Sequence, residues 1–131
     1  LGDVSVYATF GYLQEILEAE GYKTVMLPGV TSFCAAAARL GQSLTGGMEQ
    51  PLTIAPGRHV EQVLAAPGAK VLMKTGHRLP KTLDALRECG LLANSAMVCN
   101  CGLPDEAVFP VLTDYDPAQE AGYFATILVK E

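Results

Sequence analysis

The sequence predicts an α/β domain in which helices flank a mixed sheet. Short apolar runs rich in β-branched residues alternate with longer segments of helical periodicity. Glycine and proline separate these runs, as at Pro56-Gly57 and Pro67-Gly68. The alternation favours helices that cover a sheet, and the strand-rich end of the chain favours some antiparallel pairing.

The expected elements follow one another along the whole chain. A first helix is expected after an N-cap at Asp3 or Ser5 and runs to about Glu20. Further helices are expected over residues 33–40, 59–66 and 79–89. Strands are expected over residues 23–27, 52–55, 70–74, 96–99, 108–112 and 123–129. Pro110 interrupts the run 108–112, so we expect that strand at an edge of the sheet.

Length and charge exclude some classes of protein. The chain has 131 residues, half of them apolar, which is enough for one domain with a hydrophobic core. Its net charge of −5 argues against a nucleic-acid partner, because phosphates need a positive surface. No run of about 18 apolar residues occurs, so no membrane span is predicted. We expect reduced thiols and a cytoplasmic protein.

The four cysteines do not predict a metal site. Cys34 and Cys89 lie in apolar helical patterns and are expected in the core. Cys99 and Cys101 are two residues apart on a predicted strand, so they are expected on the same face. A metal there would need further ligands, and the chain offers only two histidines.

The turn at Pro28-Gly29 is the centre of the predicted organisation. The strand of residues 23–27 ends there, because Pro28 has no N–H for the sheet. Gly29 allows a sharp turn and a close approach by another group. Thr31 or Ser32 can cap the next helix. The pattern suits a ligand site at a strand end, but it also suits a plain strand-to-helix turn.

Common catalytic motifs are absent. The chain has no Gly-x-Gly-x-x-Gly, no phosphate-binding loop and no nucleophile elbow. His77 lies in a basic loop with Lys74 and Arg78, which suits either an acidic substrate or solvated surface charge. On these residues alone, Met73 is a core residue and Asp3 a helix cap. The residues by themselves predict an α/β domain with a small-molecule cleft.

Three stretches together resemble the tetrapyrrole methylase family. Residues 1–9 (Leu-Gly-Asp-Val-Ser-Val-Tyr-Ala-Thr) resemble its Gly-Asp-Pro-x-x-Tyr-x-Thr loop, with Val4 in place of the usual proline. Residues 27–41 resemble its Pro-Gly-Val-Thr-Ser-Phe segment, in the version of the enzymes that methylate carbon 20 of precorrin-2. Residues 71–74 and 123–129 match later strands of the same enzymes.

The resemblance implies a fold, a cofactor and a set of site residues. These methylases hold S-adenosylmethionine between two α/β domains, so residues 1–131 would be a single domain, the C-terminal part, with the N-terminal domain absent. The implied cofactor-binding residues are Leu1, Gly2, Asp3, Val6, Thr31, Ser32, Met73 and Cys101, the last through its backbone. No catalytic residue, general base or metal ligand is implied.

The implied function is methyl transfer from S-adenosylmethionine to carbon 20 of precorrin-2, or of cobalt-precorrin-2, in cobalamin biosynthesis. The resemblance further implies a tetrapyrrole substrate, a homodimer, and an inactive chain when the N-terminal domain is missing. Two alternatives remain open. One is a tetrapyrrole methylase for a different ring position, and the other is a non-catalytic binding or assembly domain of a fused protein.

Overall fold

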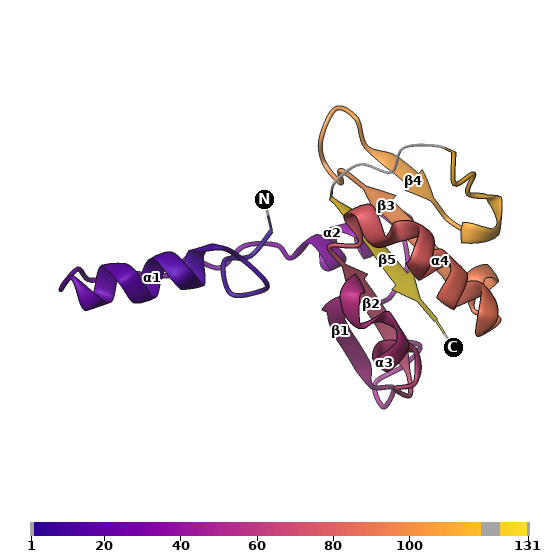
Figure 1. Ribbon diagram of the computed structural model, residues 1–131, viewed down its shortest axis with the longest axis horizontal. Coiled ribbons are helices and arrows are strands. Elements are labelled where there is room, and N and C mark those ends of the chain that lie inside the picture. Colours follow the sequence, from indigo (N-terminus) through magenta and orange to yellow (C-terminus); the bar gives the residue numbers. More distant parts are fainter. Residues whose placement is uncertain (1, 119–123, 131) are drawn as a thin grey trace.

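A mixed sheet with helices on both faces forms the body of the molecule in the computed structural model, which describes residues 2–118 and 124–130 (Figure 1). This architecture confirms the predicted fold class. The strands are β1 (Leu52–Pro56), β2 (Ala69–Met73), β3 (Ser95–Cys99), β4 (Ala107–Phe109) and β5 (Ala125–Val129), and the α-helices are α1 (Phe10–Ala19), α2 (Ser32–Leu40), α3 (Val60–Leu64) and α4 (Leu79–Glu88).

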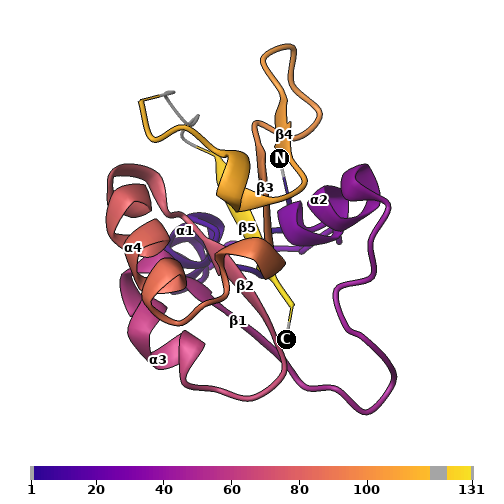
Figure 2. The same cartoon turned by 90° about the vertical axis from the view of Figure 1, so that its right-hand side faces the viewer.

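The strand order brings several strand ends to one edge. The order is β1-β2-β5-β3-β4, with β1 and β2 parallel and the other pairs antiparallel (Figure 2). Because β5 runs against both of its neighbours, the carboxyl ends of β2 and β3 lie at the same edge as the start of β5. The expected antiparallel pairing and the edge position of the strand before Pro110 are confirmed.

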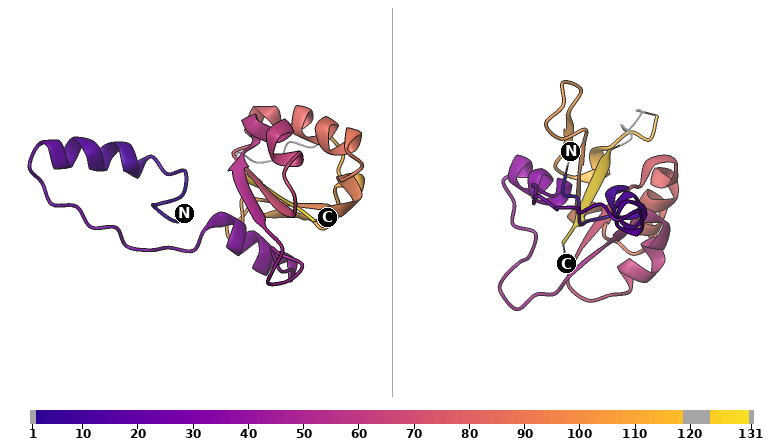
Figure 3. Two further views of the ribbon diagram at one scale, coloured as in Figure 1. Left: turned by 90° about the horizontal axis from the view of Figure 1, so that it is seen from below. Right: turned by 90° about the vertical axis from the view of Figure 1, so that its left-hand side faces the viewer.

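Both faces of the sheet are covered, which explains the continuous apolar runs of the inner strands. Leu72 of β2 and Ile127 of β5 face α3 and α4 in the larger core cluster. Val71 and Leu128, the neighbours of these two residues along the strands, pack with Phe33 of α2 on the opposite face (Figure 3). α2 ends at Leu40, as predicted, and Gly41 follows it in the left-handed conformation.

An arm of residues 10–30 projects away from this body (Figure 3). It holds α1 and an extended return segment, and none of its residues is buried. The predicted strand 23–27 is wrong, because no neighbouring strand pairs with it within the described ranges. The predicted start of the first helix is also wrong. The helix begins at Phe10, and Asp3 and Ser5 bond to other groups.

The cysteine predictions are largely wrong. Cys34 and Cys89 are exposed rather than in the core. Cys99 is buried in β3, but Cys101 lies in the loop beyond the strand, because Asn100 turns the backbone at φ 50°. Residues 2–118 and 124–130 contain no cluster of three metal-ligating side chains. Among the helices that the structure describes, none has the length and apolar character to cross a membrane.

Candidate functional site

A cavity of about 890 Å³ lies where β2 and β3 end and β5 begins. Loop Gly2–Thr9 and the turn at residues 30–32 form its other side. Its volume lies in the range of roughly 300–1,000 Å³ that is typical of small-molecule sites. Ligands of open α/β sheets commonly bind outside the carboxyl ends of strands, so the cavity lies where such a site is expected.

Asp3 joins the N-terminal loop to the central turn. One carboxylate oxygen accepts the N–H of Gly29 at 2.7 Å. The other accepts the N–H of Ser5 at 2.8 Å and the Ser5 hydroxyl. The Ser5 hydroxyl, followed by the Gly29 and Ser5 amides, lowers the pKa of the Asp3 carboxyl. Asp3 therefore connects two segments 26 residues apart, and the prediction that it caps a helix is wrong.

Gly29 has no room for a side chain. A Cβ built at this position would lie 2.3 Å from the carbonyl oxygen of Gly2. No real Cβ tolerates that distance, so a larger residue would push the loop away from the turn. The loop and the turn are thus held together by one hydrogen bond and by one close backbone approach.

Backbone strain concentrates around the cavity. In the part of the chain that the structure describes, the non-glycine residues with positive φ are Tyr7, Lys74 and Asn100, and all three line the cavity. Lys74 Nζ donates to the Tyr7 carbonyl oxygen at 2.6 Å, and the Tyr7 hydroxyl donates to the carbonyl of Ile54 at 3.0 Å. These bonds tie the loop to the sheet edge. Strained conformations of this kind gather at functional sites.

Two buried hydroxyls at the cavity carry no hydrogen bond within the described residues. They are Thr31 Oγ1 and Thr75 Oγ1. Thr31 occupies the N-cap position of α2 and its carbonyl accepts the N–H of Ala35, but its hydroxyl makes no capping bond. The expected side-chain cap at Thr31 is therefore absent. Buried polar groups are nearly always paired, so both hydroxyls suit a site that receives a polar ligand.

The loop after β3 is fixed by Glu106. Its carboxylate accepts the N–H of Gly102 at 2.8 Å and pairs with Arg39 of α2. The Gly102 amide and then Arg39 lower the pKa of Glu106. Burial, followed by the charge of Glu106, raises the pKa of the Cys101 thiol. A protonated thiol is a poor nucleophile, which agrees with a role of Cys101 through its backbone.

The structure brings the predicted site residues to this one cavity. Gly2, Asp3, Val6, Thr31, Ser32, Met73 and Cys101 line it, and Leu1 lies outside the described residues. The sequence reasoning missed Tyr7, Thr75, Asn100 and Phe124, which also line it. Thr75 and Asn100 follow predicted strands directly, so their position could have identified them. Tyr7 occupies the tyrosine position of the loop motif in residues 1–9, so the resemblance could have identified it, whereas Phe124 carries no comparable signal in the sequence.

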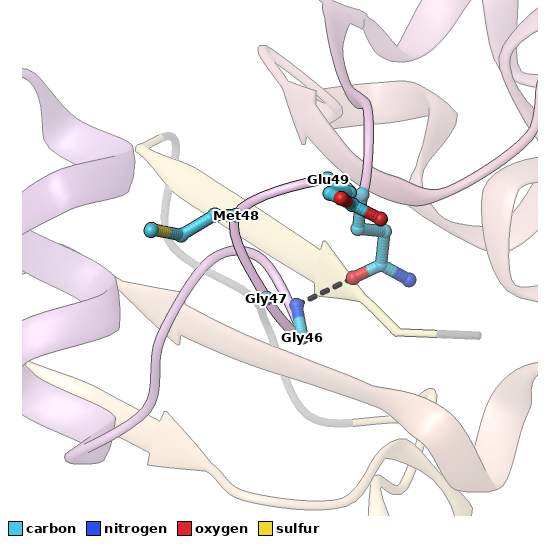
Figure 4. Close-up of a pocket in the computed structure, with 5 residues that line it drawn as sticks. Gly46, Gly47, Met48 and Glu49 are labelled. Atoms are coloured by element: carbon cyan, nitrogen blue, oxygen red, sulfur yellow. Dashed lines mark hydrogen bonds between the residues drawn. The ribbon is translucent and has the colours of Figure 1, made fainter.

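A second hollow lies on the loop of residues 46–50 (Figure 4), and it shares no lining residue with the strand-end cavity. All of its lining comes from five consecutive residues, and the Gly46 N–H donates to the Gln50 side chain across it. It is the inside of one exposed loop, where no other element contributes a group. It therefore offers no convergent set of polar side chains for a ligand.

The fold and the cavity define a class of α/β domains that hold a small molecule at the strand ends. Within that class, the chain belongs to the family of tetrapyrrole (corrin/porphyrin) methylases, whose family model matches residues 1–114. These are methyltransferases that use S-adenosylmethionine as methyl donor.

Several relatives and solved structures resemble the chain. A cobalt-precorrin-2 C(20)-methyltransferase of Salmonella typhimurium is 31% identical over 100% of this chain and 56% of its own length. A precorrin-4 C(11)-methyltransferase of Rhodococcus erythropolis is 30% identical over 98% of this chain and 57% of its own. A uroporphyrin-III-C-methyltransferase structure from Thermus thermophilus matches with a TM-score of 0.75 and 27% identity, over 98% of this chain and 60% of that one. This chain spans little more than half the length of these relatives.

The cavity residues fit S-adenosylmethionine. A Thermus thermophilus uroporphyrin-III C-methyltransferase solved with S-adenosylhomocysteine shares the fold at a TM-score of 0.70 and 19% identity, over 99% of this chain and 63% of that one. In the present chain, Val6, Met73 and Phe124 supply apolar lining. Thr31 and Thr75, whose hydroxyls have no hydrogen-bond partner in the described part of the chain, supply polar groups. The lining therefore suits a ligand that has both apolar and polar parts.

Proposed function

We propose that this chain is the cofactor-binding C-terminal domain of a methyltransferase that methylates carbon 20 of precorrin-2 or of cobalt-precorrin-2. The observation that carries the proposal is the strand-end cavity, closed by loop Gly2–Thr9 and held by the Asp3–Gly29 bond. The name of the Salmonella relative supports carbon 20. The Rhodococcus relative, named for carbon 11, makes another ring position the second candidate.

We assign a role to each cofactor-binding residue that the resemblance implies. The methionyl and sulfonium side of the cofactor would be lined by Leu1, Gly2, Asp3 and Val6. Thr31 and Ser32 would contact the cofactor from the turn. Met73 would pack near the adenosyl group, and Cys101 would contribute its backbone. When bound, the cofactor supplies a methyl group on a sulfonium. In such a transfer the methyl group would pass to the ring carbon, S-adenosylhomocysteine would leave, and the ring carbon would lose a proton.

The chain's part in this reaction is alignment. Placing donor and acceptor in contact accounts for a large share of the rate enhancement of such a transfer, and no covalent nucleophile is needed. The bonds from Tyr7, Lys74 and Asp3 hold the loop in one conformation, as a preorganised site requires. The Asp3 carboxylate already accepts three hydrogen bonds, so we assign it a positioning role and leave the general base unassigned.

The arm is the proposed contact with the rest of the methyltransferase. Tyr12, Ile16, Val25 and Leu27 are more than half exposed, an apolar surface that proteins normally cover. An N-terminal domain of the same protein is the proposed cover, followed by a second copy in a homodimer. Such an enzyme would work in the cytoplasm, with a tetrapyrrole as substrate and no nucleic-acid partner.

The proposal is tested with the full-length protein and S-adenosylmethionine that carries a ¹³C-methyl group. Incubation with precorrin-2 and with its cobalt form, followed by NMR of the product, reads out the methylated carbon. We expect a signal at carbon 20, and no turnover by the isolated 131-residue chain. Methylation elsewhere would favour the second candidate. A folded full-length protein that binds no S-adenosylhomocysteine in calorimetry would favour a non-catalytic assembly domain.

A further inference from the structure

We propose that Lys74, His77 and Arg78 form a carboxylate-binding rim at the mouth of the cavity, and that the rim binds carboxylate side chains of the tetrapyrrole. The inference rests on the proposed function, because it names the part of the same site that meets the substrate. The relevant observations are the position of the three side chains, their lack of carboxylate partners within the described residues, and the charge around them.

A sharp turn after β2 places the three residues on the cavity. Lys74 has φ 51° and Gly76 has φ 38°, so the chain reverses direction directly at the strand end. A short 3₁₀ turn, Gly76–Arg78, then leads into α4. Lys74, His77 and Arg78 all line the cavity, and all three are exposed. Their polar ends lie in solvent, so they can contact a ligand at the mouth of the cavity.

These side chains are not engaged with carboxylates. Within residues 2–118 and 124–130, the side chains of His77 and Arg78 form no hydrogen bond and no ion pair. Lys74 Nζ bonds to the neutral carbonyl oxygen of Tyr7, so its positive charge stays uncompensated. Other cations of the chain are neutralised locally, namely Arg39, Lys81 and Arg87, which pair with Glu106, Glu61 and Asp84.

The charge at the cavity differs from that of the chain as a whole. The chain has nine Lys and Arg against fourteen Asp and Glu. Lys74 and Arg78 line the cavity together with one of the two histidines, whereas Asp3 is the single acidic residue in the lining. The hydrogen bonds of Asp3 already occupy its carboxylate. An acidic protein thus presents a locally positive opening, which attracts anions and repels cations.

The chemistry of the rim suits several carboxylates. Arginine binds a carboxylate through two parallel N–H donors, and such charge-assisted bonds are the stronger class. Two exposed cations, Lys74 and Arg78, and the imidazole of His77 lie within five residues, and they suit a ligand with several carboxylates. Tetrapyrroles of the uroporphyrin type carry many, whereas S-adenosylmethionine carries one. The tetrapyrrole is therefore the better match for the whole rim.

The experiment uses the full-length protein, with uroporphyrin as the tetrapyrrole probe and S-adenosylhomocysteine as the cofactor probe. The variants are Arg78→Gln, Arg78→Lys and His77→Gln. The matched control is Arg87→Gln, which removes an exposed arginine on α4 that pairs with Asp84 and does not line the cavity. Fluorescence quenching measures the Kd for uroporphyrin, calorimetry measures the Kd for S-adenosylhomocysteine, and thermal unfolding checks the fold.

We expect Arg78→Gln to raise the Kd for uroporphyrin about five- to tenfold, the effect of losing one charge-assisted contact. His77→Gln should act in the same direction, and Arg78→Lys should restore part of the affinity. Arg87→Gln should change neither Kd. The wild-type affinity for uroporphyrin should fall with added salt, and this dependence should weaken in Arg78→Gln.

Two results would overturn the inference. If both glutamine variants bind uroporphyrin as the wild type does, the rim does not contact the substrate. If they lose affinity for S-adenosylhomocysteine instead, the bound carboxylate belongs to the cofactor. The proposed function fails separately, when the wild-type protein itself binds no S-adenosylhomocysteine. Should Arg78→Gln lower the unfolding midpoint, His77→Gln carries the test alone.

Discussion

The arm and the body of this molecule contain similar hydrophobic patterns but differ in burial. Both contain a helix with apolar residues at helical spacing and a short apolar run typical of a strand. In the body, α2 covers one face of the sheet and Phe33 is 7% exposed. In the arm, no residue of α1 is buried, and Val25 is 77% exposed. Apolar periodicity therefore indicates a surface that can be buried. Whether the surface is buried depends on which other segments pack against it.

The largest expected effect compares a leucine of each region. Leu86 of α4 is fully buried, so Leu86→Ala should lower the free energy of unfolding by about 2–5 kcal/mol. Leu13 of α1 is 52% exposed, so Leu13→Ala should change the free energy of unfolding of the 131-residue chain by less than about 0.5 kcal/mol. Urea unfolding of both variants measures the difference.

The two leucine variants also test the proposal that another part of the full-length protein covers the arm. If another part of the full-length protein covers α1, Leu13→Ala should cost clearly more there than in the isolated chain. Equal small costs in both forms would leave the arm without a cover. A large cost in the isolated chain would mean that the arm packs on the body in solution, which would break the comparison.

Two glycines give a second, smaller contrast. Gly68, in the body, has φ 80°, and a Cβ there would lie 2.3 Å from the carbonyl oxygen of Pro51. Gly29 would meet the carbonyl oxygen of Gly2 at the same distance. Gly68→Ala should lower the free energy of unfolding by more than about 1 kcal/mol. Gly29→Ala should leave the unfolding midpoint of the body nearly unchanged but weaken binding of S-adenosylhomocysteine.

Unfolding curves and calorimetry on the two variants check this contrast. The control is Gly47→Ala, because no atom lies within 4 Å of a Cβ at that position and its φ lies outside the positive range. It should affect neither property. Full cofactor affinity in Gly29→Ala would mean that the close contact between loop and turn is not needed for the site.

The contrast also explains what the sequence could predict. The body was predictable because its strands and helices bury each other, so local pattern and tertiary contacts agree. Gly41, Pro110 and the antiparallel β5 behave as their patterns indicate. The strand predicted at 23–27 failed because strand pairing requires a partner, which local pattern cannot supply.

The candidate site was predictable in part. The resemblance identified Gly2, Asp3, Thr31 and Met73, and these line one cavity although up to 71 positions separate them in the sequence. The contacts that hold the cavity-lining segments together were not predictable. The Asp3 carboxylate accepts the N–H of Gly29, and Lys74 Nζ donates to the Tyr7 carbonyl. Both contacts join segments that are distant in the sequence, so they leave no periodic pattern in the chain.

As the pH is lowered, loop Gly2–Thr9 should detach from the turn at Gly29 before the hydrophobic core unfolds. Hydrogen bonds lower the pKa of Asp3 in the folded chain, so its contribution to loop closure is complete above the ordinary Asp pKa of about 3.9. The contribution is lost as the pH falls through the lowered value. In NMR, the Gly29 amide proton should move upfield below about pH 3.9. Asp3→Asn should show the shifted position already at neutral pH, and an amide signal that ignores both changes would contradict the bond.

The smallest expected change in stability concerns Thr31, where the helix of the body meets the turn of the arm. Its hydroxyl is buried without a partner in the described residues and does not cap α2. Thr31→Val keeps the shape and removes that hydroxyl. The unfolding midpoint should therefore hold or rise slightly, because an unpaired buried hydroxyl costs about 1–3 kcal/mol. Affinity for S-adenosylhomocysteine should fall about five- to tenfold if the cofactor supplies the missing partner.

Thr82 offers the matched comparison. Its hydroxyl is also buried, but it donates to the Arg78 carbonyl at 3.1 Å, and the residue does not line the cavity. Thr82→Val should lower the free energy of unfolding by about 1 kcal/mol and leave cofactor affinity unchanged. If Thr31→Val loses cofactor affinity without losing stability, and Thr82→Val loses stability without losing affinity, the Thr31 hydroxyl contacts the cofactor. A lowered midpoint with full affinity in Thr31→Val would instead make Thr31 a helix cap, and the turn a plain connection between arm and body.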